Sequence, residues 1–269
     1  MKTALMFSPH ADDAAAFCGG TLAKLAAEGW NVVLARVTDD ARDSVGLTVE
    51  ETIRRNTEEL HAAAQALGIG EIVELGFPTD TLTDVAETIL RERFVYLIRK
   101  HRPYAVFTFD PFAQGEGNLD HIRVAQAVEE AFWVSCFDLH HPEHFTEGLE
   151  PFSVCERWYF GRPVSNPTRA VDITDYFPKR VEALAAHKTM MRNTVNQFRL
   201  QLRTWGRRAP LLDEALAGDL TPLVTGFLHA QTSATAEAHS LGEGRLGEEF
   251  RVVRFGDMEE FFEQISEPI

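Results

Sequence analysis

The sequence predicts an α/β fold with a mostly parallel β-sheet. Short apolar runs alternate with longer helical patterns at intervals of about 30 residues, and this alternation is typical of βαβ units. The apolar runs are rich in Val, Ile, Leu and Phe, as expected for strands that are covered on both faces. The chain has 269 residues, of which 45% are hydrophobic, so it can form a sizeable core without disulfide bonds.

Four strands are expected in the first half of the chain, at residues 3–8, 31–37, 71–75 and 104–109. Helices are expected after them, at residues 20–28, 49–67, 84–101 and 120–137. The second helix is expected to end at Leu67 because Gly68 can adopt the left-handed C-cap conformation at no steric cost. Asp120 suits the N-cap and the positive end of the last helix dipole.

The pattern is weaker in the second half. A loop is expected over residues 138–153, and it contains His140, His141 and His144. Strands are expected at 154–160, 170–173 and 248–255. A long helix is expected at 177–203, and a further helix at the C-terminus. We expect a single domain over residues 1–269, with 206–247 as a C-terminal insertion whose periodicity is too weak to assign helices or strands.

Composition excludes several classes of protein. The chain has 41 acidic and 26 basic residues, a net charge of −15, which argues against binding to a nucleic-acid backbone. No stretch approaches the roughly 18 apolar residues that span a bilayer, and no secretory signal pattern begins the sequence. Three widely spaced cysteines predict neither a disulfide framework nor a thiolate metal site. We therefore expect a cytoplasmic protein with no nucleic-acid or membrane partner.

Two loops carry the residues that indicate chemistry. In an open parallel sheet, ligands bind beyond the carboxyl ends of the strands where strand order reverses, here expected between the first and fourth strands. Residues 8–13 (Ser-Pro-His-Ala-Asp-Asp) follow the first strand, and residues 117–121 (Gly-Asn-Leu-Asp-His) end the loop after the fourth. Imidazole and carboxylate are ligands that suit zinc. We expect His10, Asp13 and His121 to bind one metal ion at this edge.

Three protein ligands would leave a tetrahedral position open for water, as in catalytic zinc sites. Asp12 is then placed to take a proton from that water as general base, and Asp120 to orient an imidazole. Local structure offers a simpler interpretation: residues 10–13 form a turn and N-cap cluster, and residues 120–121 only begin an exposed helix.

These residues resemble the motifs of the PIG-L/LmbE family, zinc-dependent deacetylases of N-acetylglucosamine-containing and related substrates. That family typically carries His-Pro-Asp-Asp-Glu after its first strand and His-Pro-Asp-His after its fourth. Here residues 10–14 read His-Ala-Asp-Asp-Ala, and residues 118–121 read Asn-Leu-Asp-His. The similarity covers about residues 3–190, with further matches at 18–22, 63–68, 171–173, 186–188 and 249–251.

The resemblance implies a Rossmann-like three-layer α/β sandwich with a metal site at the carboxyl ends of the strands. It implies that His10, Asp13 and His121 bind Zn²⁺, with Asp12 as general base and Asp120 in support. Fe²⁺ or Co²⁺ would suit the same ligands. The implied activity removes an acetyl group from the nitrogen of an amino sugar or a related N-acetylated small molecule. Family members often assemble as homo-oligomers.

Three positions depart from the family pattern. Ala14 replaces a carboxylate, and Asn56 stands where the family often has Arg. Asn118 replaces a histidine thought to stabilise the oxyanion; its amide can still donate a hydrogen bond, but it carries no charge. Two hypotheses follow. Either Asn118 acts as a neutral catalytic donor, or one of His140, His141 and His144 folds over the site and supplies the missing imidazole.

Other assignments remain open at this point. His187 either lies near the site or is satisfied by a neighbouring backbone group. Substrate specificity is expected to reside in the loops at residues 39–48 and 138–153. The altered motifs leave two alternative functions: a hydratase, like the 4-oxalomesaconate hydratase branch of the family, or a metal-holding but inactive binding protein. A dinucleotide-binding domain is disfavoured because residues 8–13 lack Gly-x-Gly-x-x-Gly and contain carboxylates that would repel a pyrophosphate.

Overall fold

The computed structural model describes residues 1–268 and contains one seven-stranded sheet in the order β3-β2-β1-β4-β5-β7-β6. The strands are β1 (Thr3–Ser8), β2 (Asn31–Thr38), β3 (Glu71–Phe77), β4 (Ala105–Phe109), β5 (Glu156–Phe160), β6 (Arg169–Asp172) and β7 (Gly247–Val253). Strands β1 to β5 pair in parallel, and β7 runs antiparallel to both β5 and β6. The prediction of a mostly parallel sheet is confirmed.

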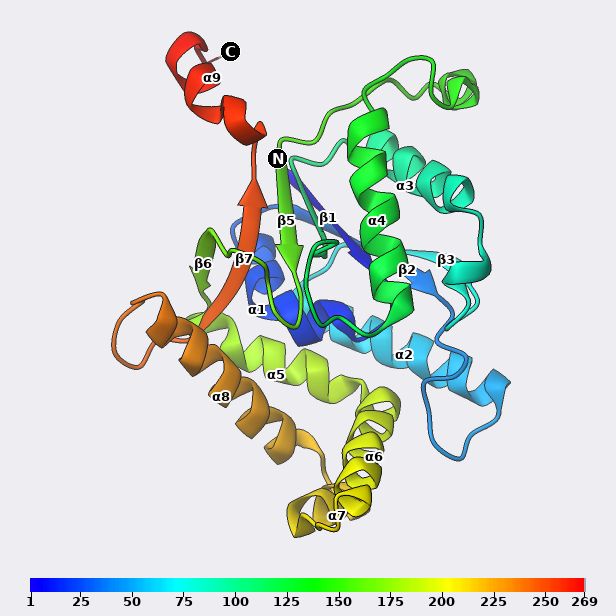
Figure 1. Cartoon of the computed structure of the whole chain (residues 1–269), viewed down its shortest axis with the longest axis vertical. Helices are drawn as coiled ribbons and strands as arrows, with labels where there is room; N and C mark the ends of the chain where they lie inside the picture. Colours follow the sequence, from blue (N-terminus) through cyan, green and yellow to red (C-terminus); the bar gives the residue numbers. More distant parts are fainter. Residues whose placement is uncertain (269) are drawn as a thin grey trace.

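Helices cover both faces of this sheet (Figure 1). They are α1 (Asp13–Ala27), α2 (Val49–Leu67), α3 (Glu87–His101), α4 (Leu119–Val134), α5 (Phe177–Ala186), α6 (Lys188–Thr204), α7 (Pro210–Ala217), α8 (Thr221–Ala238) and α9 (Glu259–Ile265). Helices α3 and α4 pack on one face, and α1, α2 and α5 on the other. The expected three-layer sandwich is therefore confirmed. No helix within residues 1–268 is long and apolar enough to cross a membrane.

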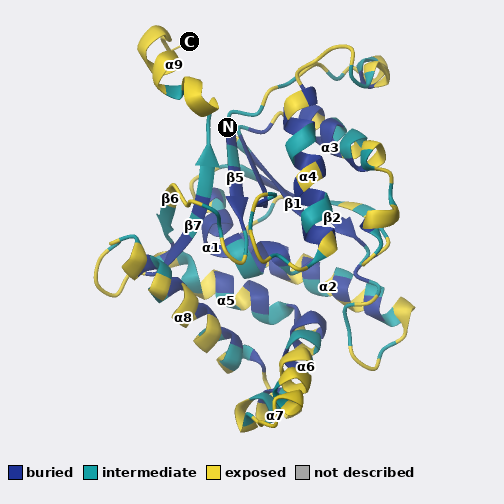
Figure 2. Cartoon of the chain, viewed as in Figure 1, coloured by how far each residue is buried: buried dark blue, intermediate teal, exposed yellow. Residues whose placement is uncertain are grey.

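The central strand β1 builds both halves of the core. Because side chains alternate across a strand, Ala4 and Met6 join the cluster under α1 and α2, whereas Leu5 and Phe7 join the one under α3 and α4. Figure 2 shows the central strands of the sheet and the helix faces that pack on them as the buried part of the molecule. β1 pairs with β2 on one side and with β4 on the other, so the loops after β1 and β4 meet at the predicted reversal of strand order.

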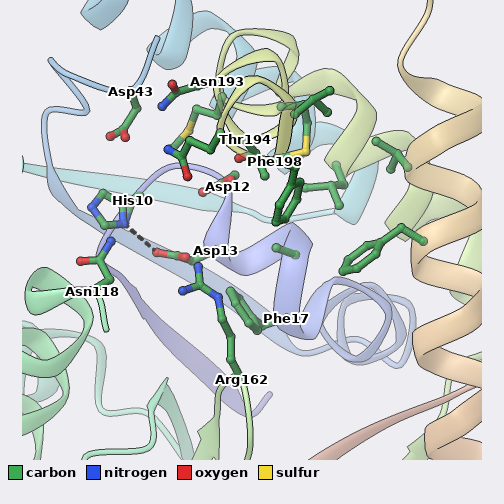
Figure 3. A pocket seen from close by; sticks show the side chains of 18 of the residues that line it. His10, Asp12, Asp13, Phe17, Asp43, Asn118, Arg162, Asn193, Thr194 and Phe198 are labelled. Atoms are coloured by element: carbon green, nitrogen blue, oxygen red, sulfur yellow. Dashed lines mark hydrogen bonds and ion pairs between the residues drawn. The ribbon is translucent and has the colours of Figure 1, made fainter. Parts of the chain in front are cut away.

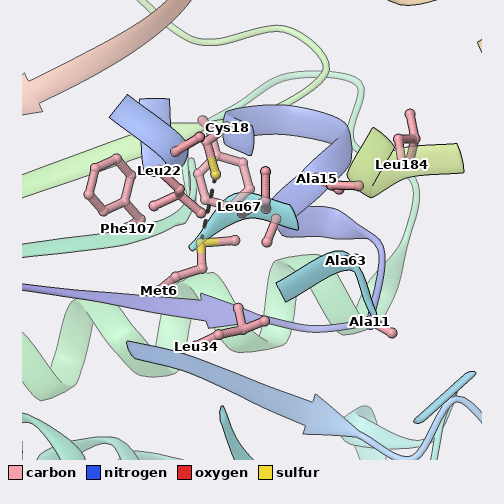
Figure 4. Close-up of a cluster of buried hydrophobic side chains, with 14 of the residues drawn as sticks. Met6, Ala11, Ala15, Cys18, Leu22, Leu34, Ala63, Leu67, Phe107 and Leu184 are labelled. Carbon is pink, nitrogen blue, oxygen red and sulfur yellow. Dashed lines mark hydrogen bonds between the residues drawn. The ribbon is translucent and has the colours of Figure 1, made fainter. Parts of the chain in front are cut away.

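The start of α1 differs from the prediction. The helix begins at Asp13, seven residues before the expected position 20, and is broken at Cys18, where φ is −141° and ψ is 19°. The Cys18 Sγ lies 3.9 Å from the Met6 Sδ within the buried cluster that Figure 4 shows. Gly20 permits close packing, since a Cβ at this position would lie 2.6 Å from the Ile173 Cδ1. The glycine pair therefore lies inside a broken helix and does not begin one.

A buried ion pair supplies the hydrogen bonds that this break removes. The Glu248 carboxylate accepts hydrogen bonds from the backbone N–H of Gly20 (2.9 Å) and Thr21 (2.8 Å). Arg180 donates to the carbonyl oxygens of Ala15 and Ala16 on the other side of the break. The Arg180 Nη1 and the Glu248 Oε1 are 3.1 Å apart, and both residues are almost fully buried. This pair fixes the first turn of α1, which carries Asp13.

Replacing Glu248 with alanine is expected to lower the free energy of unfolding by about 3 to 5 kcal/mol, because it leaves the Arg180 charge buried without a partner. Urea denaturation followed by circular dichroism measures the loss. The neighbouring Glu249 is the matched control, since it pairs with His239 near the surface and its replacement should cost at most about 1 kcal/mol. Equal losses in the two variants would contradict the assigned role of the buried pair.

One further prediction for the second half is wrong. The single helix expected at 177–203 is two helices, because His187 adopts ψ 57° between α5 and α6. Residues 206–247, for which the sequence pattern assigns no structure, contain α7 and α8. Pro210 and Pro222 lie in the first turns of these helices, where a missing N–H costs nothing. These prolines mark the starts of two helices in a stretch whose weak periodicity assigns no structure.

Smaller differences concern the ends of elements. α3 begins at Glu87 and not at 84, because residues Leu82–Asp84 form a separate 3-10 turn. α4 ends at Val134, three residues before the expected end. α2 has the bounds expected, and Gly68 is its left-handed C-cap with φ 75°.

Candidate active site

The structure brings together the three predicted metal ligands. His10 lies in the loop after β1, Asp13 begins α1, and His121 lies in the first turn of α4. The His10 Nδ1 is 3.1 Å from the His121 Nε2, and these two nitrogens lie 3.5 and 3.3 Å from the Asp13 carboxylate oxygens. All three side chains are buried, and Figure 3 shows His10 and Asp13 at one end of a cavity.

The second nitrogen of each imidazole faces another carboxylate. The His10 Nε2 is 3.4 Å from the Asp120 Oδ2, and the His121 Nδ1 is 3.4 Å from the Glu116 Oε2. Metal-binding histidines commonly have such an outer carboxylate, which orients the ring and raises its basicity. Asp120 was expected to orient an imidazole, but Glu116 was not considered, although it lies two residues before Asn118 in the same loop.

This donor set fits a divalent cation. Burial lowers the pKa of both imidazoles, but hydrogen bonds and charges from the surrounding carboxylates outweigh it, so the pKa of His10 and of His121 is raised. The group thus attracts positive charge. Two imidazole nitrogens and a carboxylate, all within 4.8 Å of one another, are the ligand types of three-ligand zinc sites.

Local capping interactions hold these side chains in place. Asn118 is the N-cap of α4, and its side-chain oxygen accepts hydrogen bonds from the N–H of Asp120 (2.9 Å) and His121 (3.4 Å). The Asp120 carboxylate accepts from the N–H of Asp80 (2.7 Å) and Leu82 (3.3 Å). Asn118 is therefore the N-cap of α4 in place of Asp120, which the sequence suggested, and the cap positions the clustered imidazole.

Asp12 behaves differently. It occupies the N-cap position of α1, but its side chain makes no capping hydrogen bond. It lines the cavity beside the His10, Asp13 and His121 group. Burial raises the pKa of Asp12 to about 7, and the adjacent Asp13 charge contributes to the increase. The carboxylate thus has no structural partner that would explain its burial next to the cluster.

The cluster opens into a cavity of about 1340 Å³. Near the cluster the lining is polar and includes Asp43, Asp80 and Asn118. Asp43 belongs to the loop over residues 39–48, which was expected to contact substrate. The Asn56 side chain holds this loop by donating to the carbonyl oxygens of Asp40 (3.1 Å) and Asp43 (3.4 Å).

The hypothesis that a loop histidine replaces the missing imidazole is wrong. His140, His141 and His144 follow the far end of α4, a 16-residue helix that begins at the site and extends about 24 Å away from it. None of these three residues lines the cavity. His144 is buried elsewhere, with its ring nitrogens 3.2 Å from the Arg99 Nη1 and 3.0 Å from the Glu92 Oε1.

His187 occupies the break between α5 and α6 and is 1% exposed. Neither ring nitrogen has a hydrogen-bond partner among residues 1–268, so the alternative in which a neighbouring backbone group satisfies His187 is wrong. Burial lowers the pKa of His187 to about 4, against a weaker opposite effect of Asp13. The residue does not line the cavity, and we assign it no chemical role.

The low pKa of His187 predicts a pH-dependent loss of stability. Because the unfolded chain protonates this histidine near pH 6.5 and the folded chain only near pH 4, folding should weaken as pH falls between these values. When pH is lowered from about 7.5 to about 5, the free energy of unfolding of His187→Gln is expected to fall by about 2 kcal/mol less than that of the parent. Urea denaturation at each pH measures this free energy. His61→Gln, on the exposed face of α2, should follow the parent. Parallel curves for the parent and His187→Gln would refute the assignment.

The fold and the cluster define a class: an α/β protein with a His–Asp–His group at the strand-order reversal of its sheet. Residues 5–132 match the PIG-L family model, described as GlcNAc-PI de-N-acetylase. The chain is 30% identical over 191 residues to diacetylchitobiose deacetylase of Thermococcus kodakarensis, covering 70% of each chain. The chain belongs to the PIG-L family, which confirms the resemblance seen in the sequence.

Solved structures share the fold. The N,N'-diacetylchitobiose deacetylase from Pyrococcus horikoshii superimposes with a TM-score of 0.75 and 22% identity, covering 97% of this chain and 88% of that chain. GalB, the 4-carboxy-2-hydroxymuconate hydratase from Pseudomonas putida, gives a TM-score of 0.69 at 16% identity and covers 100% of both chains. The same fold thus supports two different reactions, and the choice between them depends on the site residues.

Proposed function

We propose that this chain is a metal-dependent deacetylase that hydrolyses the amide of an N-acetylated amino sugar or a related small molecule. The observation that carries the proposal is the position of Asp12, a carboxylate without a structural partner beside the His10, Asp13 and His121 group, in one cavity with Asn118. Relatives named as deacetylases of N-acetylated sugars support it.

His10, Asp13 and His121 would hold the ion, with Zn²⁺ as the first choice and Fe²⁺ or Co²⁺ as alternatives for the same ligands. When bound, such an ion polarises a carbonyl and lowers the pKa of water. Asp120 and Glu116 keep the two imidazoles in the orientation that presents one nitrogen of each to the centre of the cluster.

Asp12 takes the proton from the attacking water and returns it to the leaving nitrogen, because its carboxylate lines the cavity beside the cluster and makes no capping hydrogen bond in α1. The side-chain oxygen of Asn118 accepts the hydrogen bonds of the α4 cap. Its amide N–H therefore remains available to donate to the substrate carbonyl oxygen as negative charge develops there. Cleavage gives a carboxylic acid and a free amine.

Release of a primary amine tests the proposal. The zinc-supplemented protein is incubated with N-acetylglucosamine, its methyl glycoside and di-N-acetylchitobiose, and amine and acetate are measured by a fluorogenic assay and by chromatography. We expect both products in equal amounts from at least one substrate. A protein that retains metal but releases amine from no N-acetylated compound would contradict the deacetylase function and favour the hydratase or binding-protein alternative.

A further inference from the structure

The cavity has a second half that the deacetylation of a small sugar does not require. Its volume of about 1340 Å³ exceeds the roughly 300–1,000 Å³ typical of pockets for drug-sized ligands. Figure 3 shows the polar side chains gathered around His10 at one end, with Phe17 beside Asp13 and Phe198 on the side toward α8. The cavity therefore continues well beyond the residues that would perform the chemistry.

Helices α6, α7 and α8 form one side of this second half, which is here called the apolar wall. The wall consists of Met191, Phe198 and Trp205 on or directly after α6, Leu212 on α7, and Val224 and Phe227 on α8. Sixteen described residues between 184 and 231 line the cavity, and none of them carries a charge. The charged residues of α6, such as Arg192 and Arg203, do not line it. The lining residues recur at intervals of three and four, so one face of α6 is turned to the cavity.

The apolar wall is not filled by the protein itself. Phe198, Trp205 and Phe227 are 50%, 69% and 62% exposed, although they line the same cavity as the cluster. At its inner end, Met191 and Val224 are buried. Exposed aromatic side chains that border a concave, uncharged surface mark a place where apolar ligand surface is removed from water.

We propose that the apolar wall binds an alkyl chain carried by the amide substrate, so that this protein acts on N-acylated amines with a medium-length lipid-like chain. The inference rests on the proposed function and specifies its substrate class. We infer the occupant from the fact that the wall and the cluster share one cavity. A chain attached to an amide at the cluster therefore extends onto the wall. Hydrolysis consumes one water, breaks the C–N bond, and gives the carboxylic acid and the amine.

The test separates binding from catalysis. Isothermal calorimetry compares octyl β-glucoside with methyl β-glucoside, neither of which contains an amide, below the micelle concentration. Because each buried methylene contributes substantially to affinity, we expect the octyl compound to bind at least about 30-fold more tightly. Phe198→Ser and Phe227→Ser should each reduce this preference severalfold. Phe261→Ser is the matched control, since Phe261 is 49% exposed on α9 and does not line the cavity; it should keep the preference.

A kinetic comparison then shows which end of the substrate carries the chain. N-octanoylglucosamine is compared with N-acetylglucosamine for a chain on the acyl side, and octyl with methyl N-acetyl-β-glucosaminide for a chain on the sugar side. A higher kcat/KM for the octyl member of either pair supports the proposal.

Three results are distinguishable. Equal binding of octyl and methyl glucoside would overturn the inference, whether or not the protein hydrolyses amides. Equal binding together with a change from oligomer to monomer in Phe198→Ser, measured by sedimentation, would overturn it in favour of a contact between two copies of this chain. Preferential binding of the octyl compound without hydrolysis of any amide would overturn the proposed function alone and support the apolar wall as a binding surface.

Discussion

Replacing Asp12 with asparagine is expected to lower kcat for amide hydrolysis by about 1000-fold while leaving metal binding intact. The asparagine has the same shape but cannot accept a proton at neutral pH, and general base catalysis typically contributes about 100-fold to 10,000-fold. Because the Asp12 side chain makes no capping hydrogen bond in α1, the change removes no contact that holds the helix. Steady-state release of amine measures kcat, and metal analysis of the same sample measures the ion.

Asp43→Asn is the matched control for this experiment. Asp43 lines the polar part of the same cavity but comes from the loop over residues 39–48 and not from the loop that carries the cluster. Its replacement should raise KM more than it lowers kcat, as expected for loss of a binding contact. If Asp12→Asn retains kcat within about tenfold of the parent, Asp12 is not the general base.

Asn118→Asp is expected to lower kcat by about 100-fold or more with little change in stability. The aspartate keeps the oxygen that accepts from the N–H of Asp120 and His121, but it removes the amide donor proposed for the developing oxyanion. Kinetics and thermal unfolding on the same preparation separate the two effects.

Asn118→Ala completes the comparison. This variant loses both the donor and the α4 cap, so kcat should fall as in Asn118→Asp and the free energy of unfolding should also fall by about 1 kcal/mol. An unchanged kcat in both variants would remove Asn118 from the mechanism. The pair therefore distinguishes a catalytic donor from a residue that only ends a loop.

The position of the cluster could be predicted from the sequence because its residues lie in the loops directly after β1 and β4. Parallel strands place their carboxyl ends at one edge, and these two strands are neighbours. Glu116 could have been found in the same way, since it precedes Asn118 by two residues. The orientation of each imidazole toward its own carboxylate could not be predicted, because it depends on how the loops after β1 and β4 fold against each other.

The other errors have long-range causes. The break in α1 at Cys18 depends on Arg180 and Glu248, which lie more than 150 residues further along the chain. The alternative that a loop histidine completes the site did not consider the direction of α4, whose length carries these residues away from the cluster. The apolar wall was missed because the pattern of α7 and α8 was obscured by prolines that begin these helices.

Metal content per chain is the most direct test of the central claim that His10, Asp13 and His121 form a metal site for hydrolysis. Inductively coupled plasma mass spectrometry is applied to the parent, His121→Ala and His140→Ala, all purified without a metal-affinity tag. We predict about one divalent ion per chain in the parent and in His140→Ala, which alters a residue outside the cavity, and far less in His121→Ala. A parent that holds no metal even after zinc is supplied would contradict the account.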